Sequence, residues 1–515
     1  MKHLTGMDAS FLHLESPEMP MHVGSLMVLD LPEGHSGDFY EDAERFMAGR
    51  LHLAEVFERK LARMPFDLAN PVWVHDDEVD IDYHVRHVIL PRPGTREQLE
   101  KYVARLHSSL LDRSRPLWEL YVIEGLKSGQ VAIYNKVHHS TIDGQAGIAL
   151  TKALLSDSPS PPPVKAPRRR PRGGQSQFGV AEMAGAAVSN AVDQYIKLVR
   201  ALPQAAKAIA SVLLPVSPED GKRHLKLPKG WLRAPRTPLN VALTNQRSFA
   251  ARSLSLAEVK HMAKSSGTSL NDVVLAVCAG ALKRYLADYD CKPKLPLLAA
   301  VPVSLREAGN QDMSNQVSMI VVNLATHVDD RLERLAAIQA SSSTGKTLTG
   351  NIKAAIPTDY PSLGAPWLMS GLASLYGRSG LADKLPPIVN VAISNVPGPQ
   401  FPLYFAGAKL AEWYPVSIPT HGMALNITVQ SYNGALEVGL TACRRAMPDV
   451  TDLGDYIVEE HKKLLALIAS RVAATTPAPA PAVQASAAPR RKARVAKPAP
   501  RKSTRTAEAV PKPTH

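Results

Sequence analysis

Runs of apolar residues divide the N-terminal part of the chain into segments with the spacing of strands and helices. A continuous apolar run of four to eight residues between turn residues is typical of a buried strand. Thr95, with Gln98 three residues later, has the sequence of a capping box at the start of a helix. The predicted elements of this part are strands 22–30, 117–126 and 130–137 and helices 95–111 and 145–155.

The C-terminal part shows the same mixture of patterns. Asn433-Gly434 between two apolar runs predicts a tight hairpin, because both residues adopt positive φ readily. Ser269 or Asn271 is a candidate N-cap for one of the helices. Strands and helices mix throughout, so the fold class is α/β or α+β. The predicted elements are helices 256–265, 269–285 and 449–468 and strands 295–303, 319–326, 388–394, 426–431 and 435–441.

A proline-rich and arginine-rich stretch at residues 158–177 separates the two parts and predicts a flexible linker. Residues 180–201 follow it with helical spacing of apolar residues. This helix either packs on the protein body or lies on a lipid surface, and the sequence leaves both interpretations open. The expected organisation is an N-terminal domain (1–157), a linker with an amphipathic helix (158–234), a C-terminal domain (235–473) and a tail (474–515).

Charge is concentrated at the C-terminal end. The whole chain of 515 residues has a formal net charge of +13, and residues 489–513 hold nine Lys or Arg and one Glu. The tail also has no aromatic residue, so it cannot bury enough apolar surface to fold, and we expect it to be disordered. A basic tail of this kind binds nucleic acid or anionic lipid through charge alone, without recognising bases.

The composition also bounds the location of the protein. The first 15 residues lack the apolar core of a signal peptide, and no stretch of about 18 apolar residues predicts a membrane span. Cys278, Cys291 and Cys443 are far apart and have no pairing pattern, which is typical of reduced thiols in the cytoplasm. Any contact with a membrane is therefore expected to be peripheral.

The strongest chemical signal follows predicted strand 130–137. His138 and His139 come directly after the apolar run, and Asp143 and Gly144 close the motif. A histidine at the end of a buried strand can be held rigidly, and a neutral imidazole is an effective base at physiological pH. No further cluster of Cys and His with ligand spacing is present in the sequence, so a metal site is not expected.

This histidine motif resembles that of the CoA-dependent acyltransferase superfamily, which includes chloramphenicol acetyltransferases and peptide-synthetase condensation domains. Six further blocks, in order along the chain to about residue 470, resemble the bacterial wax ester synthase/diacylglycerol acyltransferase family. They are MDASFL at 7–12, PMHVG at 20–24, SRPLWE at 114–119, LNDVVLA at 270–276, VPVSLR at 301–306 and SNVPGP at 394–399.

The resemblance implies two chloramphenicol-acetyltransferase-like domains with a cleft or tunnel between them. It implies an O-acyltransferase that moves a long-chain acyl group from acyl-CoA to diacylglycerol or to a fatty alcohol, without a cofactor, since acyl-CoA is a substrate. His139 is then the general base, and the alcohol attacks acyl-CoA directly. The expected place of such an enzyme is the cytoplasmic face of the inner membrane or the surface of lipid inclusions.

The sequence leaves more than one role open for the residues around His139. Asp143 either orients His139 or pairs with an arginine that holds the loop, and the superfamily favours the second role. We expect His138 to be structural, because neighbouring side chains on a strand point to opposite faces. The candidates for stabilising the oxyanion or lining the substrate path are Asn271, which is either a helix cap or a donor, Asp272, Trp118, Asn395, Gly398 and the backbone amide near Gly144.

Two other classes of function remain open at this point. A condensation-like enzyme with a carrier-bound or small acceptor would use the same histidine motif. A binding protein for nucleic acid or anionic lipid would act through the basic tail alone.

Overall fold

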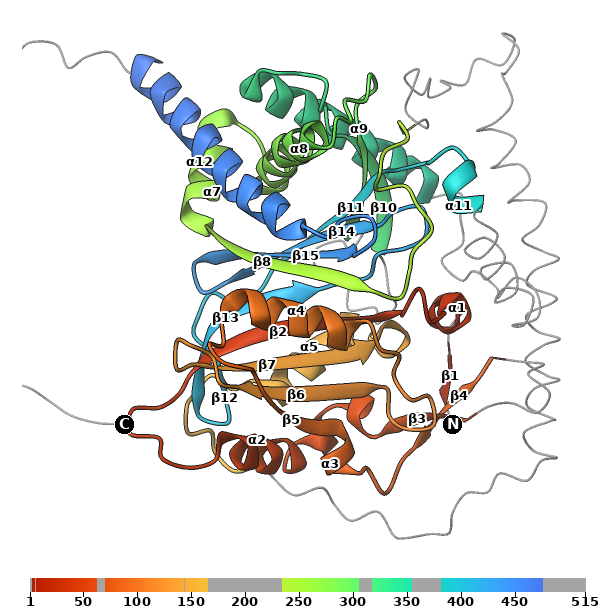
Figure 1. The fold of residues 1–515 in the computed structure, drawn as a ribbon, viewed down its shortest axis with the longest axis vertical. Helices are drawn as coiled ribbons and strands as arrows, with labels where there is room; N and C mark the ends of the chain where they lie inside the picture. Colours follow the sequence, from red (N-terminus) through yellow and green to blue (C-terminus); the bar gives the residue numbers. More distant parts are fainter. Residues whose placement is uncertain are drawn as a thin grey trace, which may run out of the picture.

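A computed structural model describes residues 2–4, 6–62, 70–142, 144–164, 234–304, 317–353 and 381–475. Within these ranges the chain forms two six-stranded sheets and one three-stranded sheet (Figure 1). Helices pack around these sheets. They are α1 (Gly6–Leu14), α2 (Phe39–Ala48), α3 (Ile81–His84), α4 (Arg96–His107), α5 (Gly144–Leu154), α7 (Leu256–Ser266), α8 (Leu270–Asp288), α9 (Arg331–Lys353), α11 (Leu381–Lys384) and α12 (Val450–Thr475).

The histidine motif follows a central strand of the first six-stranded sheet. Its central strand β7 has all eight residues buried, as expected of a continuous apolar run. It pairs antiparallel with β2 on one side and with β6 on the other. In spatial order the strands are β12 (Tyr404–Phe405), β13 (Ala408–Val416), β2 (His22–Asp30), β7 (Val131–His138), β6 (Trp118–Glu124) and β5 (Val85–Ile89).

Two strands of this first sheet come from the C-terminal part of the chain. In Figure 1 the blue strands β12 and β13 lie beside the red strand β2, and β13 pairs antiparallel with β2 from Lys409↔Asp30 to Val416↔Gly24. The predicted C-terminal domain, 235–473, includes residues 404–416. The structure places them in the sheet of the N-terminal domain, so the two halves exchange backbone hydrogen bonds.

The second sheet carries the larger hydrophobic core. Helices α7, α8, α9 and α12 pack on it and bury side chains such as Val273, Leu282 and Leu453 against β14 and β15. The small third sheet orders β1 (Lys2–His3), β4 (Val72–His75) and β3 (Arg59–Ala62). The strands of the second sheet, in spatial order, are β10 (Val317–Asn323), β9 (Leu298–Ser304), β11 (Val391–Val396), β14 (Leu425–Tyr432), β15 (Ala435–Cys443) and β8 (Arg247–Ser255).

The halves meet closely where β13 crosses β15. A Cβ atom on Gly439 would lie 1.8 Å from the carbonyl oxygen of Pro415, so only glycine fits at this crossing. Beside it, the carboxylate of Glu100 on α4 accepts a hydrogen bond of 3.0 Å from the backbone N–H of Ala251 on β8. The junction is therefore built from backbone contacts and tolerates little change in volume.

We expect Gly439→Ala to lower the free energy of unfolding by about 1–3 kcal/mol, because the β13–β15 crossing must separate to admit the methyl group. Thermal unfolding followed by circular dichroism measures the effect. Gly147→Ala on α5 is the control, since its nearest neighbour, a side-chain carbon of Ile142, is 3.6 Å away. Equal melting temperatures for both variants would show that the junction is not tightly packed.

Most predicted elements are confirmed with shifted ends. Thr95 and Gln98 form the capping box of α4, and Ser269, rather than Asn271, caps α8. Asn433 and Gly434 have positive φ angles of 41° and 88°, as the hairpin requires. The predicted helix 180–201, most of the linker and tail residues 476–515 lie outside the described residues.

Candidate active site

The histidine motif begins where β7 ends. The backbone N–H of His138 donates to the carbonyl of Leu117 at 3.0 Å, and that of His139 donates to the carbonyl of Met21 at 2.8 Å. A single 3-10 turn, His139–Thr141, follows. His139 is thus fixed by its backbone between the segments that lead into β2 and β6.

The imidazole of His139 is covered on one face. The ring of Phe11 on α1 stacks on it, with ring centroids 4.0 Å apart and an interplanar angle of 21°. Among the described residues its Nδ1 is buried without a hydrogen-bond partner. Burial, with the nearby charge of His138, lowers the pKa of His139 to about 4, although its own backbone carbonyl acts in the opposite direction. The ring is therefore neutral at pH 7 and able to accept a proton.

The side chain of His138 is fully buried and has a defined tautomer. Its Nδ1 accepts a hydrogen bond of 3.1 Å from the backbone N–H of Ser140 and lies 2.7 Å from the Ser140 hydroxyl. Because Nδ1 accepts this bond, a ring proton is on Nε2, which lies 3.2 Å from a carboxylate oxygen of Glu15. His138 thus contacts the loop and Glu15 through its two nitrogens, and its structural role stays a prediction.

Glu15, just beyond α1, carries a buried charge. Arg113 donates to one carboxylate oxygen from Nη2 at 2.7 Å and from Nε at 3.1 Å. The backbone N–H of Met21 donates to the other oxygen at 3.0 Å. Burial opposes ionisation of Glu15, but His138, Arg113 and the Met21 N–H outweigh it and lower the pKa of Glu15 to about 2. Glu15 is ionised at any pH at which the protein functions.

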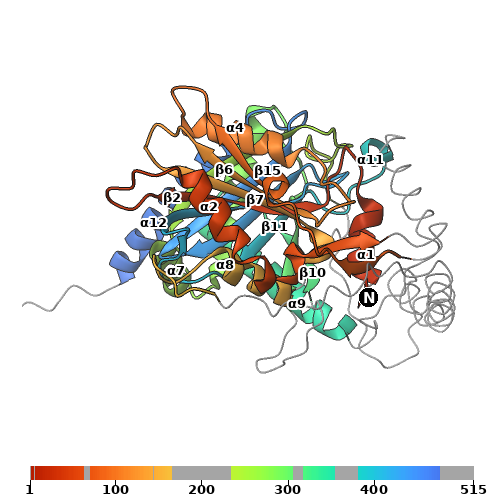
Figure 2. The same cartoon turned by 90° about the horizontal axis from the view of Figure 1, so that it is seen from below.

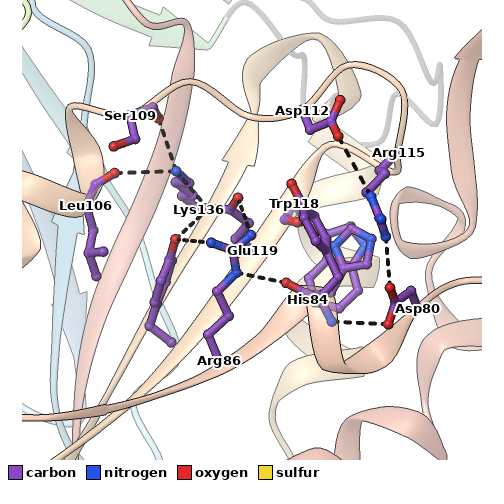
Figure 3. Close-up of polar contacts among 12 residues, drawn as sticks. Asp80, His84, Arg86, Leu106, Ser109, Asp112, Arg115, Trp118, Glu119 and Lys136 are labelled. Carbon is purple, nitrogen blue, oxygen red and sulfur yellow. Dashed lines mark hydrogen bonds and ion pairs between the residues drawn. The ribbon is translucent and has the colours of Figure 1, made fainter.

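A second buried ion pair joins β7 to the neighbouring strand β6 (Figure 3). The ammonium of Lys136, whose side chain is fully buried, lies 2.8 Å from a carboxylate oxygen of Glu119. It also donates to the carbonyls of Leu106 at 3.4 Å and Ser109 at 3.0 Å, at the C-terminal end of α4. Burial lowers the pKa of Lys136, and the Glu119 carboxylate opposes this effect. A cation at a helix C-terminus is favourable, so Lys136 holds α4 against the strand that carries the motif.

Trp118 lies in a core beside this ion pair. Its indole N–H donates to the carbonyl of Phe57 at 3.2 Å, and its ring stacks on His84 with centroids 4.3 Å apart (Figure 3). The His84 Nδ1 in turn lies 2.7 Å from the carbonyl of Trp118. These contacts are those of a packed core residue, and none of those described joins Trp118 to His139. Its predicted role in lining the substrate path stays a prediction.

The other candidates lie in the second half. Asp272 closes a capping box with Ser269 at the start of α8 and retains one buried oxygen without a hydrogen bond. Asn271 is the second residue of α8, five residues beyond Ser266, the last residue of α7. In both views α7 lies across the molecule from α1 (Figures 1 and 2). Among the described residues no contact joins Asn271 or Asp272 to His139, and their oxyanion or substrate-lining role stays a prediction.

The Ser-Asn-Val-Pro-Gly-Pro block lies at the end of β11. Asn395 is part of the parallel pair with β14, opposite Val429. The backbone N–H of Gly398 donates to the Ser431 hydroxyl at 3.0 Å, and a Cβ atom at Gly398 would lie 2.2 Å from the Ser431 carbonyl oxygen. Gly398 is thus needed for close backbone approach, and any oxyanion role for it or Asn395 stays a prediction.

Asp143 lies outside the described residues, and Gly144 is the first residue of α5. The role of Asp143 therefore remains as open as the sequence leaves it. Within the described ranges, no group of three or more His, Cys, Asp or Glu side chains is placed to hold a metal ion. None of the described helices combines the length and the apolar character needed to cross a membrane.

Phe11, Glu15 and Arg113 surround the histidines, and the sequence analysis did not identify them. Phe11 belongs to the MDASFL block and Glu15 follows it, while Arg113 directly precedes the SRPLWE block. Only Phe11 lies within a block, and Glu15 and Arg113 lie just outside the blocks. Their contacts with the motif depend on pairing across 98 residues of sequence, which no local pattern reveals.

Comparison with known proteins identifies the family. Residues 4–274 match the wax ester synthase/diacylglycerol acyltransferase catalytic domain, and residues 313–464 match the C-terminal domain of that family. A putative diacylglycerol O-acyltransferase of Mycobacterium tuberculosis is 39% identical over 90% of this chain and 99% of its own length. An O-acyltransferase of Acinetobacter baylyi is 35% identical over 92% of this chain and 98% of its own length.

A solved structure agrees with both sequence matches. The wax ester synthase/diacylglycerol acyltransferase of Marinobacter aquaeolei is 31% identical, with a TM-score of 0.65 over 91% of this chain and all of that one. The predicted α/β class with two acyltransferase-like domains is confirmed, while the cleft between them stays a prediction. The chain belongs to the wax ester synthase/diacylglycerol acyltransferase family and is an acyltransferase.

Proposed function

We propose that this protein transfers a long-chain acyl group from acyl-CoA to the hydroxyl of diacylglycerol or a long-chain alcohol, with His139 as the general base. The observation that carries the proposal is the neutral imidazole of His139, fixed at the end of β7 with Nε2 free of any partner among the described residues. The names of the similar proteins, diacylglycerol O-acyltransferases and a wax ester synthase, support the substrate classes.

The chemistry needs one base and no resident cofactor, since acyl-CoA is a substrate. Nε2 of His139 takes the hydroxyl proton as the alcohol oxygen attacks the thioester carbonyl. The tetrahedral intermediate collapses to the ester and releases the CoA thiolate. The proton on His139 then passes to that thiolate, so the base is neutral again. Backbone or side-chain N–H groups must stabilise the oxyanion meanwhile, and Asn271 and Gly398 remain candidates.

A direct assay tests the proposal and ranks the acceptors. Release of CoA from palmitoyl-CoA is measured with hexadecanol, with dioleoylglycerol and with neither. We expect release that depends on an acceptor, and the acceptor with the higher kcat/KM identifies the main activity. Release from a carrier-bound thioester but not from palmitoyl-CoA would instead support a condensation-like enzyme.

The apolar nature of both acceptors supports association with a membrane or a lipid inclusion through peripheral contact. We keep this location, on the cytoplasmic side, as part of the proposal. Binding of nucleic acid or anionic lipid by the basic tail stays a prediction, because residues 476–515 lie outside the part of the chain that the structure describes.

The pH profile gives a second test of the base. An unperturbed histidine loses its basic form below a pKa of about 6.5, whereas the lowered pKa of His139, about 4, keeps its ring neutral to a lower pH. We expect kcat/KM to stay nearly constant from pH 7 to pH 5.5. A profile that falls with a midpoint near pH 6.5 would contradict a desolvated base.

Folding must be monitored across the same range. Burial lowers the pKa of His22 and lowers that of His107 to about 3. The unfolded chain therefore binds protons before the folded one does, and the stability from these neutral histidines is lost as the pH falls from about 6.5. Circular dichroism at each pH separates loss of folded protein from loss of the base.

A further inference from the structure

We propose that Glu15, held by Arg113, is the positioning residue that sets the orientation of the base in this enzyme. This inference rests on the proposed role of His139. It assigns a function to a buried ion pair that is otherwise unexplained, between the end of α1 and the loop before β6. Glu15 does not touch the ring of His139 in any described contact, so it acts through its neighbours.

The two carboxylate oxygens of Glu15 contact different groups. Oε1 receives both contacts from the guanidinium of Arg113. Oε2 receives the N–H of Met21 and lies 3.2 Å from Nε2 of His138. The side chain of Glu15 is only 2% exposed, so water does not compete for these contacts.

Both contacts at Oε2 lead to the catalytic loop. Met21 is held by its N–H at Glu15, and its carbonyl accepts the N–H of His139 at 2.8 Å. His138 is held by Glu15 at one nitrogen, and its other nitrogen accepts the N–H of Ser140. The peptides on both sides of the base are therefore fixed by one carboxylate.

Arg113 adds the third support. The same Nη2 that binds Glu15 donates to the carbonyl of Leu12 at 2.8 Å. Leu12 follows Phe11, whose ring covers the imidazole of His139. One guanidinium thus joins the carboxylate below the loop to the helix that covers the base, and the pair is electrically neutral as a unit.

The surrounding charges make this neutrality important. The charged and titratable groups near the His138–Glu15 contact are Arg113, Lys136, His22 and His139. Without Arg113, the carboxylate of Glu15 would be a buried charge without its guanidinium partner, and the loop that it holds would have to move.

The test compares Glu15→Gln, Arg113→Gln and the double variant, assayed for kcat and KM with palmitoyl-CoA and the better acceptor, and for melting temperature. We expect kcat to fall about 10- to 100-fold in each single variant while KM changes less than about 3-fold, because a small displacement of a reacting group costs up to about 10²-fold. The double variant has no unpaired carboxylate, so it should melt at a higher temperature than Arg113→Gln.

The control is Arg96→Gln, which removes a half-exposed Arg–Glu pair, Arg96–Glu412, between α4 and β13. It should leave kcat within about 2-fold. Arg113→Lys keeps the charge without the two-point contact. It should have a lowered kcat with little change in KM, and it provides the test if Arg113→Gln does not fold.

The outcomes separate two failures. Wild-type kcat in both folded single variants, or a loss that follows only the fraction unfolded, would overturn the positioning role. Wild-type turnover in His139→Ala would instead overturn the proposed function, whatever Glu15 does.

Discussion

Replacing His139 with alanine is expected to lower kcat for acyl transfer by about 10²- to 10⁴-fold, the usual contribution of a positioned general base. The loss should be almost entirely catalytic. His139 is partly exposed, its ring makes one stacking contact, with Phe11, and its backbone N–H bond to Met21 does not depend on the side chain. CoA release under saturating substrates, together with the melting temperature, measures both effects.

His138→Ala is the matched comparison, because it removes the same side chain one residue earlier. Its ring is fully buried and contacts Glu15 and Ser140, so this variant should lose stability as well as activity. If His138→Ala were the inactive but stable variant and His139→Ala retained turnover, the roles that we assign to the two histidines would be exchanged.

The sequence predicted what depends on neighbouring residues. The run that forms β7 is apolar at nearly every position, and all eight of its residues are buried. The cap of α4 and the hairpin at Asn433-Gly434 each depend on residues within a few positions of one another. The position of His139 at a strand end follows from the same local pattern.

The sequence did not predict which sheet each strand joins. Strand β13 contains Lys409, Glu412 and Pro415, a pattern without clear alternation, and its partner β2 lies in the other half of the chain. The pairing is decided by packing at the junction, where Gly439 admits the Pro415 carbonyl. The strand propensity of a segment does not determine which distant strand it pairs with.

The surroundings of the base were missed for the same reason. Glu15 and Arg113 look like surface residues in the sequence, since charged side chains are seldom buried unless paired. Only the fold shows that they meet beneath the loop, with Glu15 almost fully buried. The reacting group could be found from a motif, while the groups that orient it could not.

Lys136→Met is expected to cause a large loss of stability, about 3 kcal/mol, because it removes one of the two cations that the structure pairs with the buried carboxylate of Glu119, the other being Arg86. It also removes the donor to the carbonyls of Leu106 and Ser109 at the end of α4. For a domain of about 150–250 residues this corresponds to a fall in melting temperature on the order of 10 °C. Thermal and urea unfolding measure the change.

Two further variants test whether Lys136→Met destabilises the protein through its lost charge or through its lost packing. Lys101→Met removes the cation from an exposed pair with Glu97 on α4, and exposed pairs contribute about 0–1 kcal/mol, so it should melt close to the wild type. Lys136→Met combined with Glu119→Gln removes the buried carboxylate that has lost one of its cations. Arg86, its other cation, is about one-third exposed and can be solvated by water, so we expect the double variant to regain part of the lost stability. Equal destabilisation in the single and double variants would mean that Lys136 stabilises the fold through the α4 carbonyls and its packing, and that the charge of Glu119 contributes little.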